Sequence, residues 1–241
     1  MAQAPLTRNQ ILPVILFFLI CAPFFANAQD PPLSPAGRRA QHLRHGINAS
    51  EWFAQSLDYG PQRLSTYTTL DDITLIHKLG FDHVRLSIDP EIFNCRSSWR
   101  ECDRVQALDA VVAKALAEGL TVVIDVHPDE QFKRKLATDN FSVEKFRLLW
   151  GSIAAHFAPL NPELVAFEIL NEPEHKDPYR WSGIEARIIE EIRRRAPQHT
   201  IIVSGAEYSD IGNLILLPEF KDDNLIYNFH YYEPHLFTHQ G

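Results

Sequence analysis

Short apolar runs alternate with longer stretches of helical periodicity along most of this chain. In residues 68–79, apolar side chains recur at helical spacing and Gly80 follows as a stop, which predicts a helix. Residues 83–88 form a short apolar run ended by Asp89-Pro90, which predicts a strand. The same reasoning predicts further strands over 43–48, 120–126, 164–170, 200–203 and 225–231, and further helices over 103–118, 142–157 and 181–196.

Three local expectations accompany this pattern. Ser142 is expected to cap the helix that it begins. Trp52 and Phe53 are expected in the loop after the first strand. Residues 30–39 are rich in proline and polar side chains, so we expect a linker without packed structure there.

The joints between helix and strand repeat along the chain. LGFDHVRL and EGLTVVID both join the end of a helix, a glycine, an apolar residue and a strand, as in βα-repeat proteins. Right-handed crossovers then allow an open doubly wound sheet or a closed barrel. The first strand is not followed by a G-x-G-x-x-G turn, and polar residues stand at the tips of many strands. This favours an α/β fold of the (β/α)8 TIM-barrel class, incomplete because about six of the eight βα units are present.

The N-terminal segment, residues 1–28, has the pattern of a secretory signal peptide. Arg8 supplies a positive charge, residues 11–25 are apolar but interrupted by proline, and Ala26-Asn27-Ala28 provides an A-x-A cleavage site. Lipid attachment at Cys21 is a weaker alternative, because a large residue precedes it. We therefore expect a mature chain of residues 29–241, a partial catalytic barrel, in a secreted or periplasmic location.

Charge and cysteine content limit the partners of the mature chain. Loss of the signal segment lowers Lys+Arg from 23 to 22 against 31 Asp+Glu, a net charge of about −9. An acidic chain is a poor partner for nucleic acid or an anionic membrane, whereas a neutral polysaccharide is indifferent to the charge. Cys95 and Cys102 could close a small disulfide loop in an oxidising compartment; a redox or metal pair is the less favoured alternative.

Residues 164–173, LVAFEILNEP, carry the strongest signal for chemistry. An apolar run of this kind is typical of a parallel strand buried on both faces, and Pro173 ends it. Asn171 and Glu172 therefore stand at the carboxyl end of a buried strand. In parallel α/β folds this end is where ligands bind and reactions occur.

Other strand ends carry polar residues as well. Each has a structural interpretation: Arg85 could be a buried charge that needs a carboxylate partner, and His127 a core histidine. Asn171 could bond the turn, and Glu172 could be a solvated acid. Several polar tips that converge on one mouth nevertheless favour a functional site. The tips are Arg85, His127, Asn171, Glu172, Glu207, His230 and Tyr232.

Four of these segments carry a resemblance to a known family. HVRLSID, VVIDVHPD, FEILNEP and YNFHYYEPHLFTHQG occur in the order typical of glycoside hydrolase family 5, the cellulase family, which this chain resembles. The resemblance implies a retaining β-glycoside hydrolase acting on a β-1,4-linked polysaccharide, with endo-β-1,4-glucanase as the first choice. A β-mannanase or another β-glucanase is the alternative. It implies no cofactor or metal, and a monomer when complete.

The resemblance also implies roles for individual residues. Glu172 would be the general acid/base, with a pKa raised by burial and a second carboxylate, and Asn171 would hold the sugar 2-hydroxyl. Arg85 and Tyr232 would orient the nucleophile. The remaining expected substrate contacts are His127, His230 and, by stacking on sugar faces, Trp52, with Trp99 and Trp181 as further stacking candidates; Trp150 is expected in the core.

One part of the family pattern is not found. The family places its nucleophile, a Glu, at strand seven and a Trp at strand eight, whereas the sequence ends at Gly241, after the sixth predicted strand. Glu207 and Glu233 are the in-chain candidates for a second carboxylate, and neither has the expected position. We therefore expect a fragment that is inactive alone and prone to aggregate through unpaired strand edges.

Two rival functions remain. A metal-dependent hydrolase could use Asp125 and His127 with His230, His235 and His239, but no H-x-H pair is present. A non-catalytic carbohydrate-binding remnant could retain the sugar groove without turnover.

Overall fold

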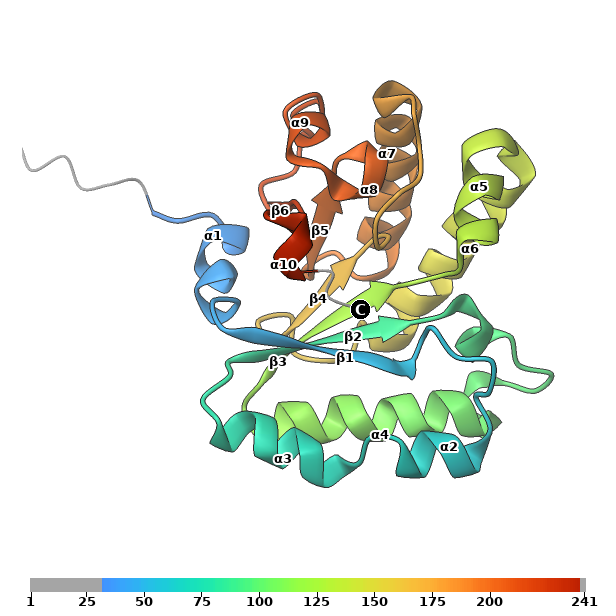
Figure 1. Cartoon of the computed structure of the whole chain (residues 1–241), viewed down its shortest axis with the longest axis vertical. Coiled ribbons are helices and arrows are strands. Elements are labelled where there is room, and N and C mark those ends of the chain that lie inside the picture. The colour runs from blue at the N-terminus through green and yellow to red at the C-terminus, as the bar shows by residue number, and fades with distance from the viewer. Residues whose placement is uncertain (1–31, 239–241) are drawn as a thin grey trace, which may run out of the picture. The chain divides into compact units, whose positions relative to one another are not determined.

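The computed structural model describes residues 32–238 of the chain. Its centre is a six-stranded parallel sheet in which every strand pairs with its neighbour in sequence (Figure 1). This order is an incomplete (β/α)8 barrel, as the sequence predicted. The strands are β1 (Gly46–Phe53), β2 (His83–Ile88), β3 (Thr121–Val126), β4 (Val165–Glu168), β5 (Thr200–Ser204) and β6 (Leu225–Asn228).

Helices connect the strands and cover the outer face of the sheet. The pair α3 and α4 lies side by side along one part of it, and α6 and α7 along the next (Figure 1). The α-helices are α1 (Pro35–Arg39), α2 (Pro61–Thr66), α3 (Leu70–Lys78), α4 (Asp103–Ala117), α5 (Glu130–Thr138), α6 (Asn140–Phe157), α7 (Pro178–Arg195), α8 (Ala206–Ser209), α9 (Ile211–Leu214) and α10 (His235–Thr238). Single 3₁₀ turns are η1 (Ala40–His42), η2 (Pro90–Phe93) and η3 (Trp99–Glu101).

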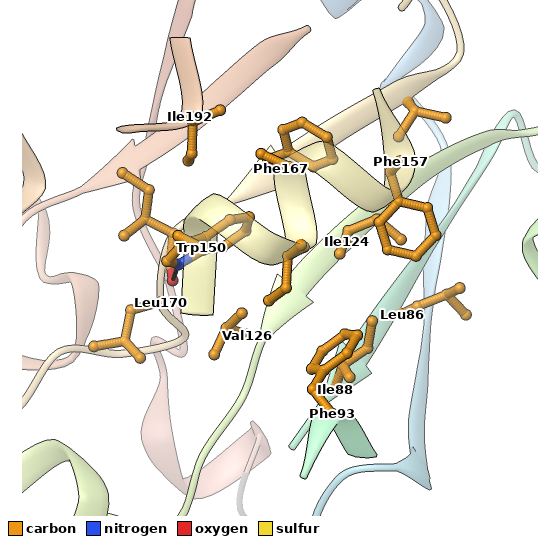
Figure 2. Packing of buried hydrophobic residues seen from close by; sticks show 14 of the residues in the cluster. Leu86, Ile88, Phe93, Ile124, Val126, Trp150, Phe157, Phe167, Leu170 and Ile192 are labelled. Carbon is orange, nitrogen blue, oxygen red and sulfur yellow. Dashed lines mark hydrogen bonds between the residues drawn. The ribbon is translucent and has the colours of Figure 1, made fainter. Parts of the chain in front are cut away.

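The two faces of the sheet differ in chemistry because successive side chains point to opposite sides. Outward residues such as Ile124 and Phe167 are fully buried in one cluster, in which Phe167 packs against Trp150 of α6 (Figure 2). Inward residues form a separate, small apolar cluster in which Val123 takes part. Asp125 lies two residues further along β3 on the same inner face, so the polar site is built above an apolar layer.

The first strand differs from the prediction. It runs over Gly46–Phe53 rather than 43–48, with an irregular register between Ala49 and Phe53. Trp52 and Phe53 therefore lie in the strand and not in a loop, and both are buried. The indole of Trp52 donates to the carbonyl of Leu64, 2.9 Å away, which anchors this strand to α2.

Two helix assignments also need correction. Helix α5 was not expected; it begins after Asp129, whose carboxylate accepts the backbone N–H of Phe132. Asp139, not Ser142, caps α6, because its carboxylate accepts the backbone N–H groups of Phe141 and Ser142. Aspartate is as good a cap as serine, so the helix starts earlier than predicted.

The segment expected as an unstructured linker is partly folded. Residues 35–39 form α1, with Ser34 as its cap. Arg39 is buried and donates to Glu163 (2.7 Å) and to the carbonyl of Gln198 (2.5 Å). These contacts to distant residues hold the segment in place.

The predicted disulfide is present, whereas the predicted signal peptide cannot be compared with the structure. Cys95 and Cys102 form a disulfide that closes the loop between η2 and α4. The signal peptide and Cys21 lie outside the described residues. Within residues 32–238, no helix is both long and apolar enough to cross a membrane.

Candidate active site

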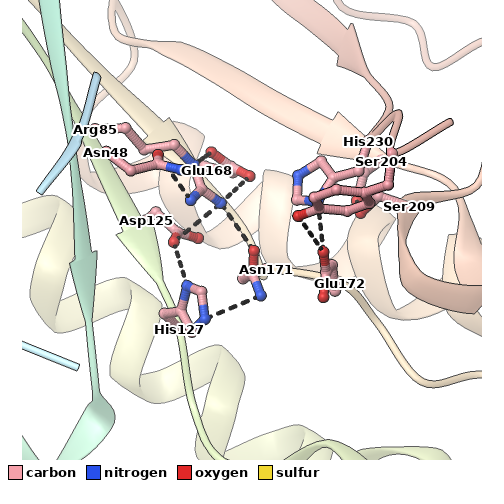
Figure 3. Close-up of polar contacts among 11 residues, drawn as sticks. Asn48, Arg85, Asp125, His127, Glu168, Asn171, Glu172, Ser204, Ser209 and His230 are labelled. Atoms are coloured by element: carbon pink, nitrogen blue, oxygen red, sulfur yellow. Dashed lines mark hydrogen bonds and ion pairs between the residues drawn. The ribbon is translucent and has the colours of Figure 1, made fainter. Parts of the chain in front are cut away.

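The inner face and the carboxyl ends of the strands enclose a cavity of about 610 Å³. Polar side chains from five of the strands and their following loops line it (Figure 3). Six of the predicted tip residues come together here: Arg85, His127, Asn171, Glu172, His230 and Tyr232.

Glu172 lies at the mouth of this cavity with an unusual backbone. Its φ of 47° is in the left-handed region, which costs about 1–2 kcal/mol for a residue with a side chain. His230 Nδ1 lies 2.8 Å, and the Tyr232 hydroxyl 3.1 Å, from the same carboxylate oxygen, Oε1. The other oxygen, Oε2, accepts no hydrogen bond from residues 32–238. One oxygen is thus held in place while the other is available.

The electrostatics of Glu172 overturn one expectation. The hydrogen bond from His230 lowers the pKa of Glu172 and outweighs burial, which acts in the opposite direction. The charge of His230, the Tyr232 hydroxyl and the charge of Lys133 lower this pKa further. The expected rise required a second carboxylate beside Glu172. The neighbours found among the described residues are donors and cations instead.

Arg85 is the centre of a buried ionic cluster. Its guanidinium makes two hydrogen bonds to Glu168, at 2.6 and 2.8 Å, and an ion pair with Asp125 at 3.0 Å. The side chains of Asp125 and Glu168 are 0% and 4% exposed, so both buried carboxylates depend on Arg85 for charge compensation. Asn48 accepts a longer bond of 3.3 Å from Arg85 Nη1.

Asn171 connects this cluster to His127. Its Oδ1 accepts from Arg85 Nη2 at 3.1 Å, and its Nδ2 lies 3.1 Å from His127 Nε2. The other ring nitrogen of His127, Nδ1, lies 3.0 Å from Asp125 Oδ2. The side chain that would meet a sugar hydroxyl is therefore fixed on both sides (Figure 3).

Sequence reasoning did not identify Glu168 or Asn48, and it considered Asp125 only as a metal ligand. A signal was present for the two acids, because each interrupts an otherwise apolar strand, in VVIDV and VAFE. A carboxylate in such a place needs a cation, and Arg85 supplies it from β2, which is next to the strand of Asp125 and two strands from that of Glu168.

The tryptophans do not form the expected sugar platform. Trp52 and Trp181 are 1% and 0% exposed, and their indoles donate to backbone carbonyls of Leu64 and Ser204. The prediction that Trp52 binds substrate is therefore wrong for this structure, because its ring is enclosed by the core. Trp99 packs on Phe93 away from the cavity, and Trp150 lies in the core as predicted.

The alternative acids and the metal site find little support. Neither Glu207 nor Glu233 lines the cavity; each accepts a hydrogen bond close by in sequence, from Asn213 and His235 respectively. Among residues 32–238, no group of three or more His, Cys, Asp or Glu side chains is placed to hold a metal ion. His239 lies outside this range.

Comparison with known proteins links this geometry to one family. The family described as Cellulase (glycosyl hydrolase family 5) matches residues 43–241. Cellodextrinase A of Ruminococcus flavefaciens is 35% identical over 212 residues, which cover 84% of this chain and 62% of that protein. Endoglucanase C of Acetivibrio thermocellus is 30% identical over 206 residues, which cover 82% and 60% respectively. The chain thus spans about three fifths of the length of these relatives.

Solved structures show the same arrangement of strands and helices. Endoglucanase Cel5A from Thermotoga maritima superposes with a TM-score of 0.71 at 31% identity, covering 87% of this chain and 66% of that one. A second structure of that enzyme, titled as a complex with mannotriose, gives a TM-score of 0.72 at 30% identity, with 85% and 65% covered.

Proposed function

This chain belongs to the cellulase family, glycosyl hydrolase family 5, and from that premise we propose that it forms the acid/base half of a retaining β-glycosidase. The observation that carries the proposal is the position of Glu172 in the cavity, held by His230 and Tyr232 and adjacent to the fixed amide of Asn171. Oε2 of Glu172 is the oxygen that would protonate the glycosidic oxygen and later accept a proton from water.

The lowered pKa of Glu172 suits one half of this cycle. A carboxylate held by donors is ready to act as a base, whereas an acid needs a proton near neutral pH. A second carboxylate at about 5–5.5 Å, the spacing of retaining enzymes, would raise the pKa through like-charge repulsion. The cavity is lined by one other carboxylate from the described residues, Glu168, which is bound to Arg85. We place the nucleophile on a segment beyond these residues.

Arg85 has donor capacity for such a nucleophile, and Tyr232 lies beside it. Arg85 Nη1 makes a single hydrogen bond within the described part of the chain, the 3.3 Å contact to Asn48. Both residues line the cavity close to Glu172. They would orient the incoming carboxylate, while His127 and His230 would border the reacting sugar.

We propose a β-1,4-glucan as the substrate and endo-cleavage as the mode of action. Endoglucanase and cellodextrinase are the names of the relatives at 30–35% identity. A β-mannan is the second candidate, since the Thermotoga maritima enzyme has been crystallised with mannotriose as well as cellobiose. Glucose and mannose differ in configuration at C2, where Asn171 would bind. Initial rates on carboxymethylcellulose and on β-1,4-mannan therefore separate the two.

The decisive experiment measures turnover and binding together. A form of the protein extended beyond Gly241, so that it supplies a second carboxylate, is compared with its Glu172→Gln variant. We expect reducing-sugar release from carboxymethylcellulose by the first, and cello-oligosaccharide binding without release by the second. Binding without turnover by both forms would replace the hydrolase with a carbohydrate-binding function.

We also propose a cellular location and an oligomeric state for this protein. The charged and apolar pattern of residues 1–28 and the disulfide between Cys95 and Cys102 support a secreted or periplasmic protein, and we propose a monomer for its complete form. N-terminal sequencing of exported protein should begin near Gln29. An uncleaved N-terminus would contradict this location.

A further inference from the structure

Asp125 has a position that its pairing with Arg85 does not fully explain. It is completely buried on the inner face of β3, beside Glu168 in the register with β4. Arg85 already has a two-point ion pair with Glu168, so the guanidinium does not need a second acid for charge balance. The carboxylate of Asp125 also reaches His127, two residues along the same strand.

The hydrogen-bond directions along this path follow from which atoms can donate. Arg85 can only donate, and the Asp125 carboxylate can only accept. Asp125 Oδ2 therefore accepts from His127 Nδ1 at 3.0 Å, and it forms an ion pair with Arg85 Nη2 at the same distance. The proton of the neutral His127 ring must then sit on Nδ1, which leaves Nε2 as an acceptor.

The amide of Asn171 is oriented by the two neighbours together. Its Oδ1 must face the donor Arg85, and its Nδ2 must face the acceptor Nε2 of His127, each at 3.1 Å. If His127 carried its proton on Nε2, two N–H groups would oppose each other. Rotating the amide would only transfer the conflict to Arg85. One N–H of the amide is left to face the cavity that Asn171 lines.

We propose that Asp125 is a positioning residue that fixes His127 in its Nδ1–H form and thereby presents the Asn171 amide as a hydrogen-bond donor to a sugar hydroxyl. The sugar ligand rests on the proposed function above, whereas the tautomer does not. Asp125 itself lies behind His127 and does not line the cavity, so it acts through its neighbours.

The first test is the imidazole ¹⁵N spectrum of the 241-residue chain, which distinguishes the two tautomers directly. A His127→Gln sample assigns the signal among the 11 histidines. We expect Nδ1–H in the unchanged protein. Asp125→Ala and Asp125→Leu leave the Nδ1 proton without an acceptor, so the Nε2–H form should become populated together with a displaced Asn171 amide. Both leave Arg85 paired with Glu168, and leucine retains the packing volume if alanine impairs folding.

Two further variants separate the hydrogen bond from charge and packing. In Asp125→Asn the amide oxygen can occupy the Oδ2 position, where one atom serves both Arg85 and His127, so the Nδ1–H form should persist. Thr121→Val, a buried change on the same face of β3, should also leave the tautomer unchanged. An Nε2–H signal in the unchanged protein, or Nδ1–H retained in both acceptor-free variants, would overturn the proposal.

The second test connects the tautomer to sugar recognition. Binding of cellobiose is compared with binding of its analogue that lacks the 2-hydroxyl on the reducing-end ring. One lost neutral hydrogen bond should weaken binding up to about tenfold in the unchanged protein and by less than about threefold in Asp125→Ala. If neither sugar binds, the proposed function fails while the tautomer result stands. If the preference is equal in both proteins, the positioning role fails while glucan binding stands.

Discussion

Replacing Arg85 by methionine should strongly destabilise the folded chain, because two carboxylates would remain buried without their cation. The guanidinium makes two hydrogen bonds to Glu168 and an ion pair with Asp125, whose side chains are 4% and 0% exposed. Removing one partner of a buried ion pair costs about 3–5 kcal/mol. Methionine occupies much of the same volume, so little of this loss would come from a cavity.

The dependence on pH tests the electrostatic origin of that loss. In Arg85→Met, protonation of a buried carboxylate removes its uncompensated charge, so the native state of the variant should bind more protons than its unfolded state. Its stability should then fall as the pH rises, and its deficit relative to the unchanged protein should shrink on acidification. A simple packing defect would give a deficit that does not change with pH.

Urea unfolding followed by tryptophan fluorescence at pH 7 and pH 5 measures both quantities. The matched control is Arg134→Met, which breaks an exposed ion pair with Glu130 and should leave the free energy of unfolding almost unchanged. Adding Glu168→Gln to Arg85→Met should recover part of the loss. A deficit below about 1 kcal/mol at pH 7, or one that is constant down to pH 5, would refute the reasoning.

Three other predictions concern Glu172, the groups that lower its pKa, and the buried His199. Glu172→Gln in an extended, active form should lower kcat on carboxymethylcellulose by about 10²–10⁴-fold. The loss of kcat should be much smaller on aryl glycosides, because their leaving groups need no proton. Equal losses on both substrates would contradict the role of Glu172 as an acid. Tyr232→Phe or Lys133→Met removes a group that lowers the pKa of Glu172, so a ¹³C carboxyl titration should shift to higher pH, and an unchanged midpoint would count against these contacts. Burial lowers the pKa of His199 to about 4, so the stability that its neutral ring contributes is complete above the unfolded pKa near 6.5 and is lost as the pH falls towards 4. Urea titrations at pH 7 and 4.5 measure this loss of unfolding free energy, which should be smaller by about 1–3 kcal/mol in His199→Phe. An equal loss in both proteins would exclude His199 as its source.

The repeated order of helices and strands was predictable because it depends on local periodicity. The strand that carries Glu168 and the tips at Arg85, His127 and Asn171 lie where the alternation placed them. The positions of the tips are therefore encoded in short segments, whereas their function could be inferred only from the set of tips together.

What could not be predicted depends on contacts between distant segments. The irregular register of β1 moves Trp52 from a loop into the core, and no local pattern marks that shift. The pKa of Glu172 is lowered rather than raised, because His230 donates a hydrogen bond to it. His230 lies 58 residues away in sequence, so no local pattern predicts this contact. The sign of that shift depends on which side chain arrives at Oε1, and only the folded arrangement specifies this.

Only one of the two Glu172 oxygens accepts hydrogen bonds from the described residues, and this bears on whether the carboxyl group must rotate during the proposed reaction. Since His230 and Tyr232 both donate hydrogen bonds to Oε1, a proton can leave and return at Oε2 while the side chain keeps its rotamer. We expect no reorientation of the carboxyl group between the departure of one sugar and the entry of water. In the glycosidase proposed above, loss of these two contacts would let the carboxyl group rotate between the two steps, and turnover would slow even though Glu172 remained in place.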